Sequence, residues 1–388
     1  MNPRYVIEVL DKTLTPIARI KSLAPMGGGH FVTYSTALSN YGEANIRVST
    51  KDPLFTLYGD ILKPYANHLR ISRSGVVVWQ GVIINCPHRT RLYIDVQAFT
   101  YEYLLKKTLI IHDVADGNGA ENYKTFKTGN LAAAITAIMT DAKTYAGAAS
   151  ALSLVSIGTV ENPNFSQSFT DPTNATTSWA GLPWAFSDKF QLKFDYKDTL
   201  NVLQSFGIYA QCDFVIGITP GGLTFQFKVY IGNKQTNLVF EYGPTGAIQD
   251  YDAPLDGGGT INDLTGIAAD NTFNILKANK VDSASVNLYG KVAGVLAYND
   301  AKNLNALTAR MTEEIIFTAT PDSEVHVTLN DRAYPLGQYG LGDTVTLRVK
   351  DHLINVSQER RIVGIDVTVS QEGYETIKLI TNLPRANQ

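Results

Sequence analysis

Residues 69–98 read LRISRSGVVVWQGVIINCPHRTRLYIDVQA, and this stretch decides the fold class. Its runs of Val, Ile and Leu are separated by the turn-forming pair Ser74-Gly75 and by Pro87. Short apolar, β-branched runs that are broken by Gly and Pro are typical of consecutive strands. The stretch therefore predicts neighbouring short strands, and strands at this spacing indicate a small barrel or a sandwich.

A second stretch near the C-terminus has the same layout. Residues 347–378 again give strand, loop, strand, turn and strand. Gly81 and Ile94 are thirteen positions apart, as are Gly364 and Ile377, whereas the preceding loops differ in length. Because this layout is common in β proteins, a true repeat and a chance similarity both stay open. If the repeat is real, the chain contains two related β-barrels, and three copies would present six similar units around one axis.

Between these stretches the pattern changes to helices and loops. Residues 113–190 are rich in Asn, Gly, Ala, Ser and Thr, and Asn130 can cap a helix within them. We expect two more helices, one capped by Asp198 and one near 301–313, and a loop over 250–264. The further strands expected are 4–10, 44–49, 212–219, 223–230, 315–319, 324–329, 344–350, 362–369 and 375–379.

The composition allows two interpretations. Of 388 residues, 44% are hydrophobic and 18% are charged, against roughly 25% charged residues in ordinary soluble domains. This balance, with 20 Tyr and 16 Phe, is typical of a protein that buries surface against neighbours, and equally of an ordinary β-rich protein. The net charge of -3 argues against a nucleic-acid-binding protein.

The chain ends and the cysteines give no sign of export or metal binding. The N-terminus lacks a basic segment followed by an apolar one, so we expect no signal peptide. No run of about eighteen apolar residues predicts a membrane span. Cys86 and Cys212 lie outside any metal-binding motif, and we expect them to be small buried residues.

Sequence motifs for catalysis are lacking. The six histidines are scattered, and no nucleophile elbow or phosphate-binding loop is found in the sequence. Asp250-Tyr251-Asp252, followed by Asp256, could place oxygens around calcium, but an acidic loop is the better interpretation. Paired carboxylates for sugar hydrolysis could come from Glu313-Glu314 and from Asp11, Asp343 and Glu375, although the sequence cannot place them face to face. We therefore predict no enzyme activity, no catalytic residue, no cofactor and no metal.

The three tryptophans divide into two groups. Trp79 follows Val76-Val77-Val78 within a strand pattern, so we expect it in the core. Trp179 and Trp184 flank Gly181-Leu182-Pro183 in the polar insertion, where they are expected to contact a partner or to anchor a loop.

Several local segments, in order along the chain, resemble a known family. The segments are 42–48, 69–71, 78–83, 96–98, 103–105, 199–210, 223–225, 334–336, 341–345 and 361–365. With them the chain resembles the baseplate or tail hub proteins of long-tailed bacteriophages. The residues for which we expect structural roles are Trp79, Gly81, Gly342, Asp343 and Gly364.

The resemblance implies a fold and a domain division. The fold would be mainly β with a few helices, a β-rich α+β fold with two small β-barrel, tube-like domains and inserted α+β domains. Residues 1–111 would form the first β-barrel hub domain, and 193–245 with 307–388 would form the second. Residues 112–192 and 246–306 would be the two parts of the inserted domain.

The resemblance also implies a role in the virion. The chain would be a homotrimer at the tail tip or baseplate, assembled in the host bacterial cytoplasm. It would join the hexameric distal tail protein ring to a central fibre or spike protein and hold the C-terminus of the tape measure protein. It would close the channel until DNA ejection, and DNA would pass through without specific binding. The alternatives are the distal tail ring protein itself, a carbohydrate-binding adhesin or a wall-degrading enzyme.

Overall fold

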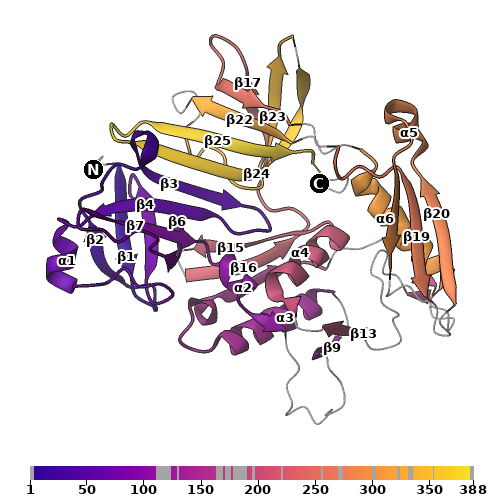
Figure 1. Cartoon of the computed structure of the whole chain (residues 1–388), viewed down its shortest axis with the longest axis horizontal. Coiled ribbons are helices and arrows are strands. Elements are labelled where there is room, and N and C mark those ends of the chain that lie inside the picture. Colours follow the sequence, from indigo (N-terminus) through magenta and orange to yellow (C-terminus); the bar gives the residue numbers. More distant parts are fainter. Residues whose placement is uncertain are drawn as a thin grey trace.

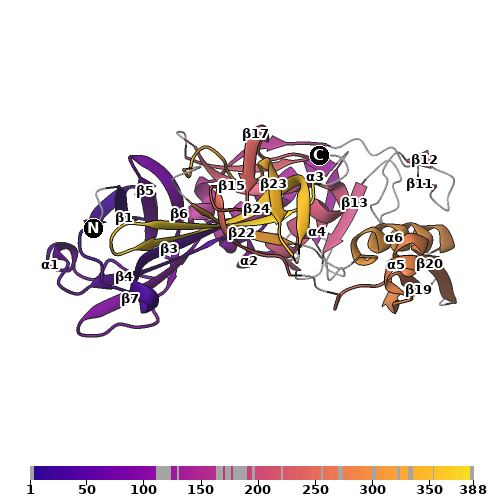
Figure 2. The same ribbon diagram turned by 90° about the horizontal axis from the view of Figure 1, so that it is seen from above.

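The protein is described here by a computed structural model, and its fold class is the expected β-rich α+β class (Figure 1). Its long axis runs from the first strands at one end to a small α/β unit at the other (Figure 2). The described residues are 4–110, 124–128, 131–162, 169–170, 176–177, 190–194, 197–219, 222–254, 257–269, 274–298, 303–320, 324–330, 335–352 and 354–384.

The first β unit is built from the N-terminal strands, in which buried and partly buried side chains alternate. Trp79 lies in one long strand, β6, which pairs with β5 and β7. The elements are β1 Tyr5–Leu10, β2 Pro16–Ile20, η1 Gly27–Gly29, β3 His30–Ala37, β4 Glu43–Ser49, α1 Pro53–Tyr58, β5 His68–Arg73, β6 Val76–Asn85 and β7 Tyr93–Phe99.

The second β unit comes from the C-terminal half and lies across the first (Figure 1). Its strand β24 pairs with β3, so that both units belong to one thirteen-stranded sheet and share one hydrophobic core. The elements are β17 Lys234–Glu241, β18 Ile248–Asp252, β22 Val325–Asn330, β23 Thr344–Lys350, β24 Asn355–Ser370 and β25 Glu375–Asn382.

The two stretches of the suspected repeat lie in units that have the same order of strands. In the first unit the order across the sheet is β3-β4-β7-β6-β5, and in the second it is β18-β22-β25-β24-β23. Every neighbouring pair in both series is antiparallel. Each unit is therefore a Greek key in which three consecutive strands pair in turn and the strand before them lies beside the last.

The two expected closed barrels are not confirmed, since no closed barrel is detected in the described part of the chain. Strand β24 explains why. One of its edges pairs with β25, whereas the other pairs with β23 over residues 355–361 and then with β3 over residues 364–370. This edge of β24 therefore pairs with a strand of the first unit instead of closing the second unit into a barrel.

An α/β unit with a second core lies below the sheet in Figure 1. The apolar face predicted for its helix α3 is buried, and Oδ1 of Asp198 accepts a bond of 2.9 Å from Asn201 N to cap α4, as expected. Asn130 lies outside the described residues. The elements are α2 Glu102–Lys106, β8 Leu109–Ile110, β9 Lys124–Thr128, α3 Leu131–Ala146, η3 Ala151–Leu154, β10 Ser156–Val160, β11 Phe169–Thr170, β12 Thr176–Thr177, β13 Phe190–Phe194, β14 Lys197–Asp198, α4 Thr199–Ala210, β15 Asp213–Thr219 and β16 Gly222–Lys228.

A small unit with a third core is inserted between β18 and β22. Its helix α6 runs to Thr318, so the strand predicted at 315–319 is wrong; Leu307, Met311 and Ile315 continue the helical spacing and are buried. The loop predicted at 250–264 is wrong only at its two ends, which belong to β18 and β19. The elements are β19 Asp263–Ala269, β20 Ile275–Val281, α5 Ser283–Tyr289, β21 Ala293–Ala297 and α6 Leu304–Thr318.

No helix in the described ranges is long and apolar enough to cross a membrane.

Candidate functional site at the junction of the β units

Trp79 and Gly81 form the centre of the first β unit. Trp79 is 1% exposed, and its Nε1 donates a hydrogen bond of 2.9 Å to the carbonyl of Ser35. A Cβ at Gly81 would lie 2.1 Å from the carbonyl oxygen of Phe99. Because a backbone oxygen cannot move out of the way cheaply, only glycine fits between β5 and β7 at this position.

Gly342 and Asp343 shape a loop over residues 335–343, called here the wall loop. Gly342 has φ +87°, and a Cβ there would lie 2.1 Å from the carbonyl oxygen of Ile231. The carboxylate of Asp343 accepts hydrogen bonds from the backbone N–H of Asn233 at 2.6 Å and of Gly340 at 2.8 Å. These contacts fix the turn and attach it to the segment that leads into β17.

A buried ion pair joins the two β units. Arg73 on β5 contacts Glu375 on β25 through two hydrogen bonds of 2.8 and 2.7 Å, and the Glu375 side chain is fully buried. Tyr5 OH donates to the same carboxylate at 2.9 Å. Nη1 of Arg73 donates to the carbonyl of Leu336 at 3.0 Å, so the pair also holds the start of the wall loop.

A second buried ion pair joins the second β unit to the α/β unit. Arg361 on β24 contacts Asp213 on β15, and both side chains are 3% exposed. The same guanidinium donates to the carbonyls of Ile231 at 2.9 Å and Gly342 at 3.1 Å. Each arginine therefore has several acceptors, as a buried charge requires.

These two pairs were not found from the sequence. Arg73 and Glu375 are 302 positions apart, and Arg361 and Asp213 are 148 apart. No local pattern connects residues at such distances. Neighbouring basic residues such as Arg360-Arg361 usually lie on a solvated face, whereas here Arg361 is buried.

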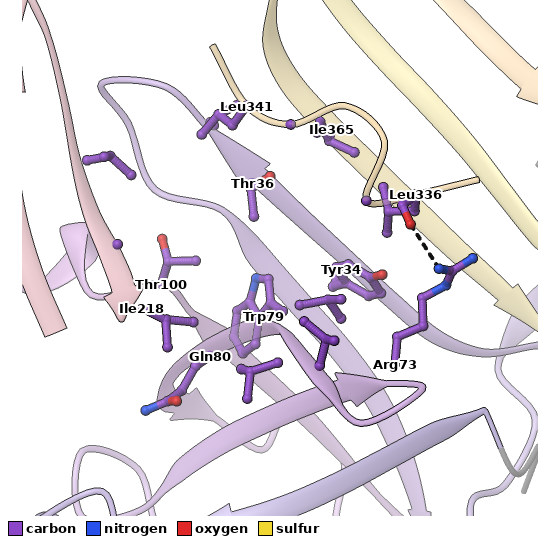
Figure 3. A pocket seen from close by; sticks show the side chains of 18 of the residues that line it. Tyr34, Thr36, Arg73, Trp79, Gln80, Thr100, Ile218, Leu336, Leu341 and Ile365 are labelled. Carbon is purple, nitrogen blue, oxygen red and sulfur yellow. Dashed lines mark hydrogen bonds between the residues drawn. The ribbon is translucent and has the colours of Figure 1, made fainter. Parts of the chain in front are cut away.

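A cavity of about 580 Å³ lies among β3, β6, β15 and the wall loop (Figure 3). Figure 3 shows Trp79 near the middle of the view, with Ile218 beside it and the wall-loop residues Leu336 and Leu341 above it. Glu102 also lines it, and Oε1 of Glu102 accepts a hydrogen bond of 2.6 Å from the backbone N–H of Ile216. Burial raises the pKa of Glu102 above its ordinary value.

A second hollow, of about 600 Å³, contains the acidic stretch considered for calcium. Asp250 and Asp252 belong to the edge strand β18 rather than to a loop, and Asp351 bonds Tyr251 OH. Within the described ranges, no three carboxylates, histidines or cysteines are grouped so as to hold a metal. Asp256 lies outside these ranges.

The remaining residues singled out in the sequence are not part of the two ion pairs or of the cavity lining, or they lie outside the described residues. Gly364 is in β24, where a Cβ would lie 3.0 Å from Cδ1 of Ile380. Cys212 is buried as expected, whereas Cys86 is only partly buried; both are free thiols. Trp179 and Trp184 lie outside the described residues, and so does the side chain of Glu313.

The fold is that of phage tail proteins, so the resemblance inferred from the sequence is confirmed at the level of fold. The chain is similar to the 43 kDa tail protein of prophage MuSo2 from Shewanella oneidensis, with a TM-score of 0.60, 12% identity and 98% of both chains covered.

Two further solved structures share the fold along nearly the whole chain. A tail protein from Neisseria meningitidis MC58 has a TM-score of 0.58 and 12% identity, over 98% of this chain and 96% of that one. Prophage tail protein gp18 from Listeria monocytogenes EGD-e has a TM-score of 0.54 and 12% identity, over 98% and 95%. No protein-family model and no curated protein matches the chain.

Proposed function

We propose that this chain is the structural hub of a phage tail tip or baseplate and has no enzymatic activity. The observation that carries the proposal is the duplicated strand order within one chain. Three copies arranged around an axis would present six similar β units. Such an object can match a hexameric distal tail ring, because each ring subunit then meets a similar surface.

The two buried ion pairs support a mechanical role. They join three units of the chain at one junction, in which Arg73 and Arg361 hold the two ends of the wall loop. Breaking a buried pair costs about 3–5 kcal/mol, so the junction resists separation of the units. A protein that holds a ring, a tape measure C-terminus and a central fibre or spike in register needs such stiffness.

The proposal includes the place of the chain and the passage of DNA. The hub belongs to the virion and closes the tail channel until DNA ejection. The net charge of -3 suits a channel that DNA crosses without specific binding, because a basic lumen would hold phosphate.

We keep the domain division of the resemblance as part of the proposal: 1–111 for the first hub domain, 193–245 and 307–388 for the second, and 112–192 and 246–306 for the inserted parts. The hydrophobic cores add a refinement, because β15 and β16 pack with α3 and α4 rather than with β17.

Native mass spectrometry of the full chain tests the proposal. The expected mass is three times the subunit mass of 42.4 kDa. A hexamer would favour the distal tail ring protein, and a monomer at micromolar concentration would contradict the hub. The carbohydrate-binding adhesin gains no support from the described residues, since Trp179 and Trp184 lie outside them.

A further inference from the structure

The cavity beside the wall loop has a strand edge as one of its walls. β15 is the outer strand of the sheet β10-β16-β15. On its free edge, the N–H of Phe214 donates to Oγ of Ser39 at 3.1 Å, and the N–H of Ile216 donates to Glu102 at 2.6 Å. Backbone groups alternate between the two edges of an antiparallel strand, so the N–H of Ile218 belongs to the same free edge.

The first part of this edge is closed and the next part is open. Ser39 and Glu102 cap the edge at Phe214 and Ile216, whereas Ile218 N has no such cap among the described residues. The Ile218 side chain is 41% exposed and lines the cavity. Unpaired strand edges bind extended chains readily, which is why proteins usually cover or charge them.

The chemistry of the cavity walls selects a neutral, apolar ligand. Val76, Val78, Leu336 and Leu341 line it, and Val76 is 66% exposed at its rim. The positive charge of Arg73 is neutralised by Glu375. Of the polar lining groups, Oε2 of Glu102 is buried and makes no hydrogen bond in the described part of the chain, although Thr100 lies near enough to lower the pKa of this carboxyl somewhat.

We propose that the cavity binds an extended, uncharged apolar peptide segment of a partner protein, which pairs with the uncapped end of the β15 edge at Ile218. The peptide backbone pairs with Ile218, and one alternate side chain enters between Val76 and Leu341. Main-chain pairing gives such complexes affinity, while pockets for alternate side chains give specificity. A volume of about 580 Å³ accommodates a few residues of such a segment. The inference does not depend on the proposed trimer.

Trp79 gives a direct readout of binding. The chain has three tryptophans, so replacing Trp179 and Trp184 with Phe leaves Trp79, which lines the cavity, as the sole reporter. The probe is the peptide acetyl-Thr-Val-Thr-Val-Thr-Val-amide, added to the full-length chain. We expect a saturable shift of Trp79 emission. The same peptide with an N-methyl group on every residue keeps the side chains but loses the N–H donors of all six residues, and we expect at least about tenfold weaker binding.

A matched pair of variants tests the strand edge itself. Ile218→Pro removes the N–H on the free edge without removing a bond to β16, a place where proline is tolerated in strands. Ile218→Val keeps the N–H. We expect Ile218→Pro to weaken binding of the probe about tenfold and Ile218→Val to leave it within twofold. If Ile218→Pro does not fold, Ala37→Leu, which fills the cavity from β3, is expected to abolish binding.

Three results would overturn the proposal. They are no binding of the unmethylated peptide, equal binding of the N-methylated peptide, or binding of dodecyl maltoside with no binding of either peptide. The last result would identify a general apolar cavity. Native mass spectrometry tests the trimer separately from peptide binding. A chain that does not bind the peptide can therefore be distinguished from a chain that does not form the trimer.

Discussion

Gly81 and Gly364 occupy matching positions in the sequence of the two β units, yet their surroundings differ. Gly81 in β6 lies opposite Leu69 of β5, within its own unit. Gly364 in β24 lies opposite Ala37 of β3, in the other unit. At this position the strand therefore pairs within its own unit in the first case and with the neighbouring unit in the second.

This difference shows where two β units of the same strand order can become connected through a shared sheet. The strand order is kept in both units, so this shared order supplies the framework. The two units are connected where the second differs from the first, namely in the length of β24 and in the register shift between Ile362 and Gly364. Bulges of this kind redirect a strand, and here the part of β24 beyond the shift pairs with β3.

The largest expected effect comes from breaking the ion pair between the two β units. Glu375→Ala leaves Arg73 buried at 9% side-chain exposure without its carboxylate. We expect the free energy of unfolding, measured in urea, to fall by about 4 kcal/mol. Asp213→Ala, at the other joint, is expected to cost a similar amount, because Arg361 is equally buried.

The matched control is the exposed pair of Arg89 and Asp60, whose side chains are each 47% exposed. Asp60→Ala is expected to change stability by less than about 0.5 kcal/mol. Equal effects of Asp60→Ala and Glu375→Ala would show that the buried pair does not hold the two units together.

The two glycines test the comparison directly. Gly81→Ala places Cβ 2.1 Å from a backbone oxygen, whereas Gly364→Ala places it 3.0 Å from the end of the Ile380 side chain. We expect a loss of about 3 kcal/mol for Gly81→Ala and about 1 kcal/mol for Gly364→Ala. Thermal and urea unfolding of both variants measure this, and the reverse order would contradict the different roles of β6 and β24.

The sequence predicts the strands of each β unit well and the contacts between the units poorly. Alternation and turn residues locate most strands, and the spacing between Gly81 and Ile94 points to the layout that both units share, because these signals are local. The pairing of β24 with β3 depends on residues more than 300 positions apart. Likewise, nothing around Glu375 indicates that its partner is Arg73, since burial of a charge is decided by the assembled core.

The edge of β15 was missed for a similar reason. The strand itself was predicted at 212–219, but a sequence does not say which strand is outermost in a sheet. Whether the edge is open depends further on Ser39 and Glu102, which reach it from the first half of the chain.

Acid is expected to lower the free energy of unfolding through a buried histidine of the first β unit. His68 on β5 is 1% exposed, and burial lowers its pKa from 6.5 to about 4, while Asp11 opposes the shift weakly. The unfolded chain therefore binds a proton between pH 6.5 and 4 that the folded chain does not, and stability is lost as pH falls through this window. By pH 5 the loss amounts to about 2 kcal/mol.

The comparison of His68→Leu with the original chain isolates this effect. Burial raises the pKa of Glu102 and Asp366, and these groups act in the opposite direction, so only the difference between the two proteins is informative. We expect His68→Leu to flatten the fall in stability between pH 7 and pH 5. His352→Gln, at an exposed histidine, serves as the control. If stability falls with pH as steeply in His68→Leu as in the original chain, His68 is not the group responsible.

The smallest expected effect concerns one ion pair in each β unit. Arg70 on β5 contacts Glu8 of the antiparallel neighbour β1 at 3.5 Å, and both side chains are about three-quarters buried. Lys234 on β17 contacts Glu359 of β24 at 2.8 Å, and both are about half exposed. Partial burial and a further bond from Arg70 to the carbonyl of Leu14 favour the first pair.

Double-mutant cycles at these two pairs measure the difference. We expect a coupling of about 1 kcal/mol for Arg70 with Glu8, and less than about 0.5 kcal/mol for Lys234 with Glu359. Raising the salt concentration to about 1 M should remove the Lys234 coupling, because exposed charges are screened within a few ångströms, and should leave part of the Arg70 coupling. A larger coupling at Lys234 would mean that the parallel pairing of β17 with β23 relies on this contact. The second unit would then be fastened at its outer strands as well as at β24.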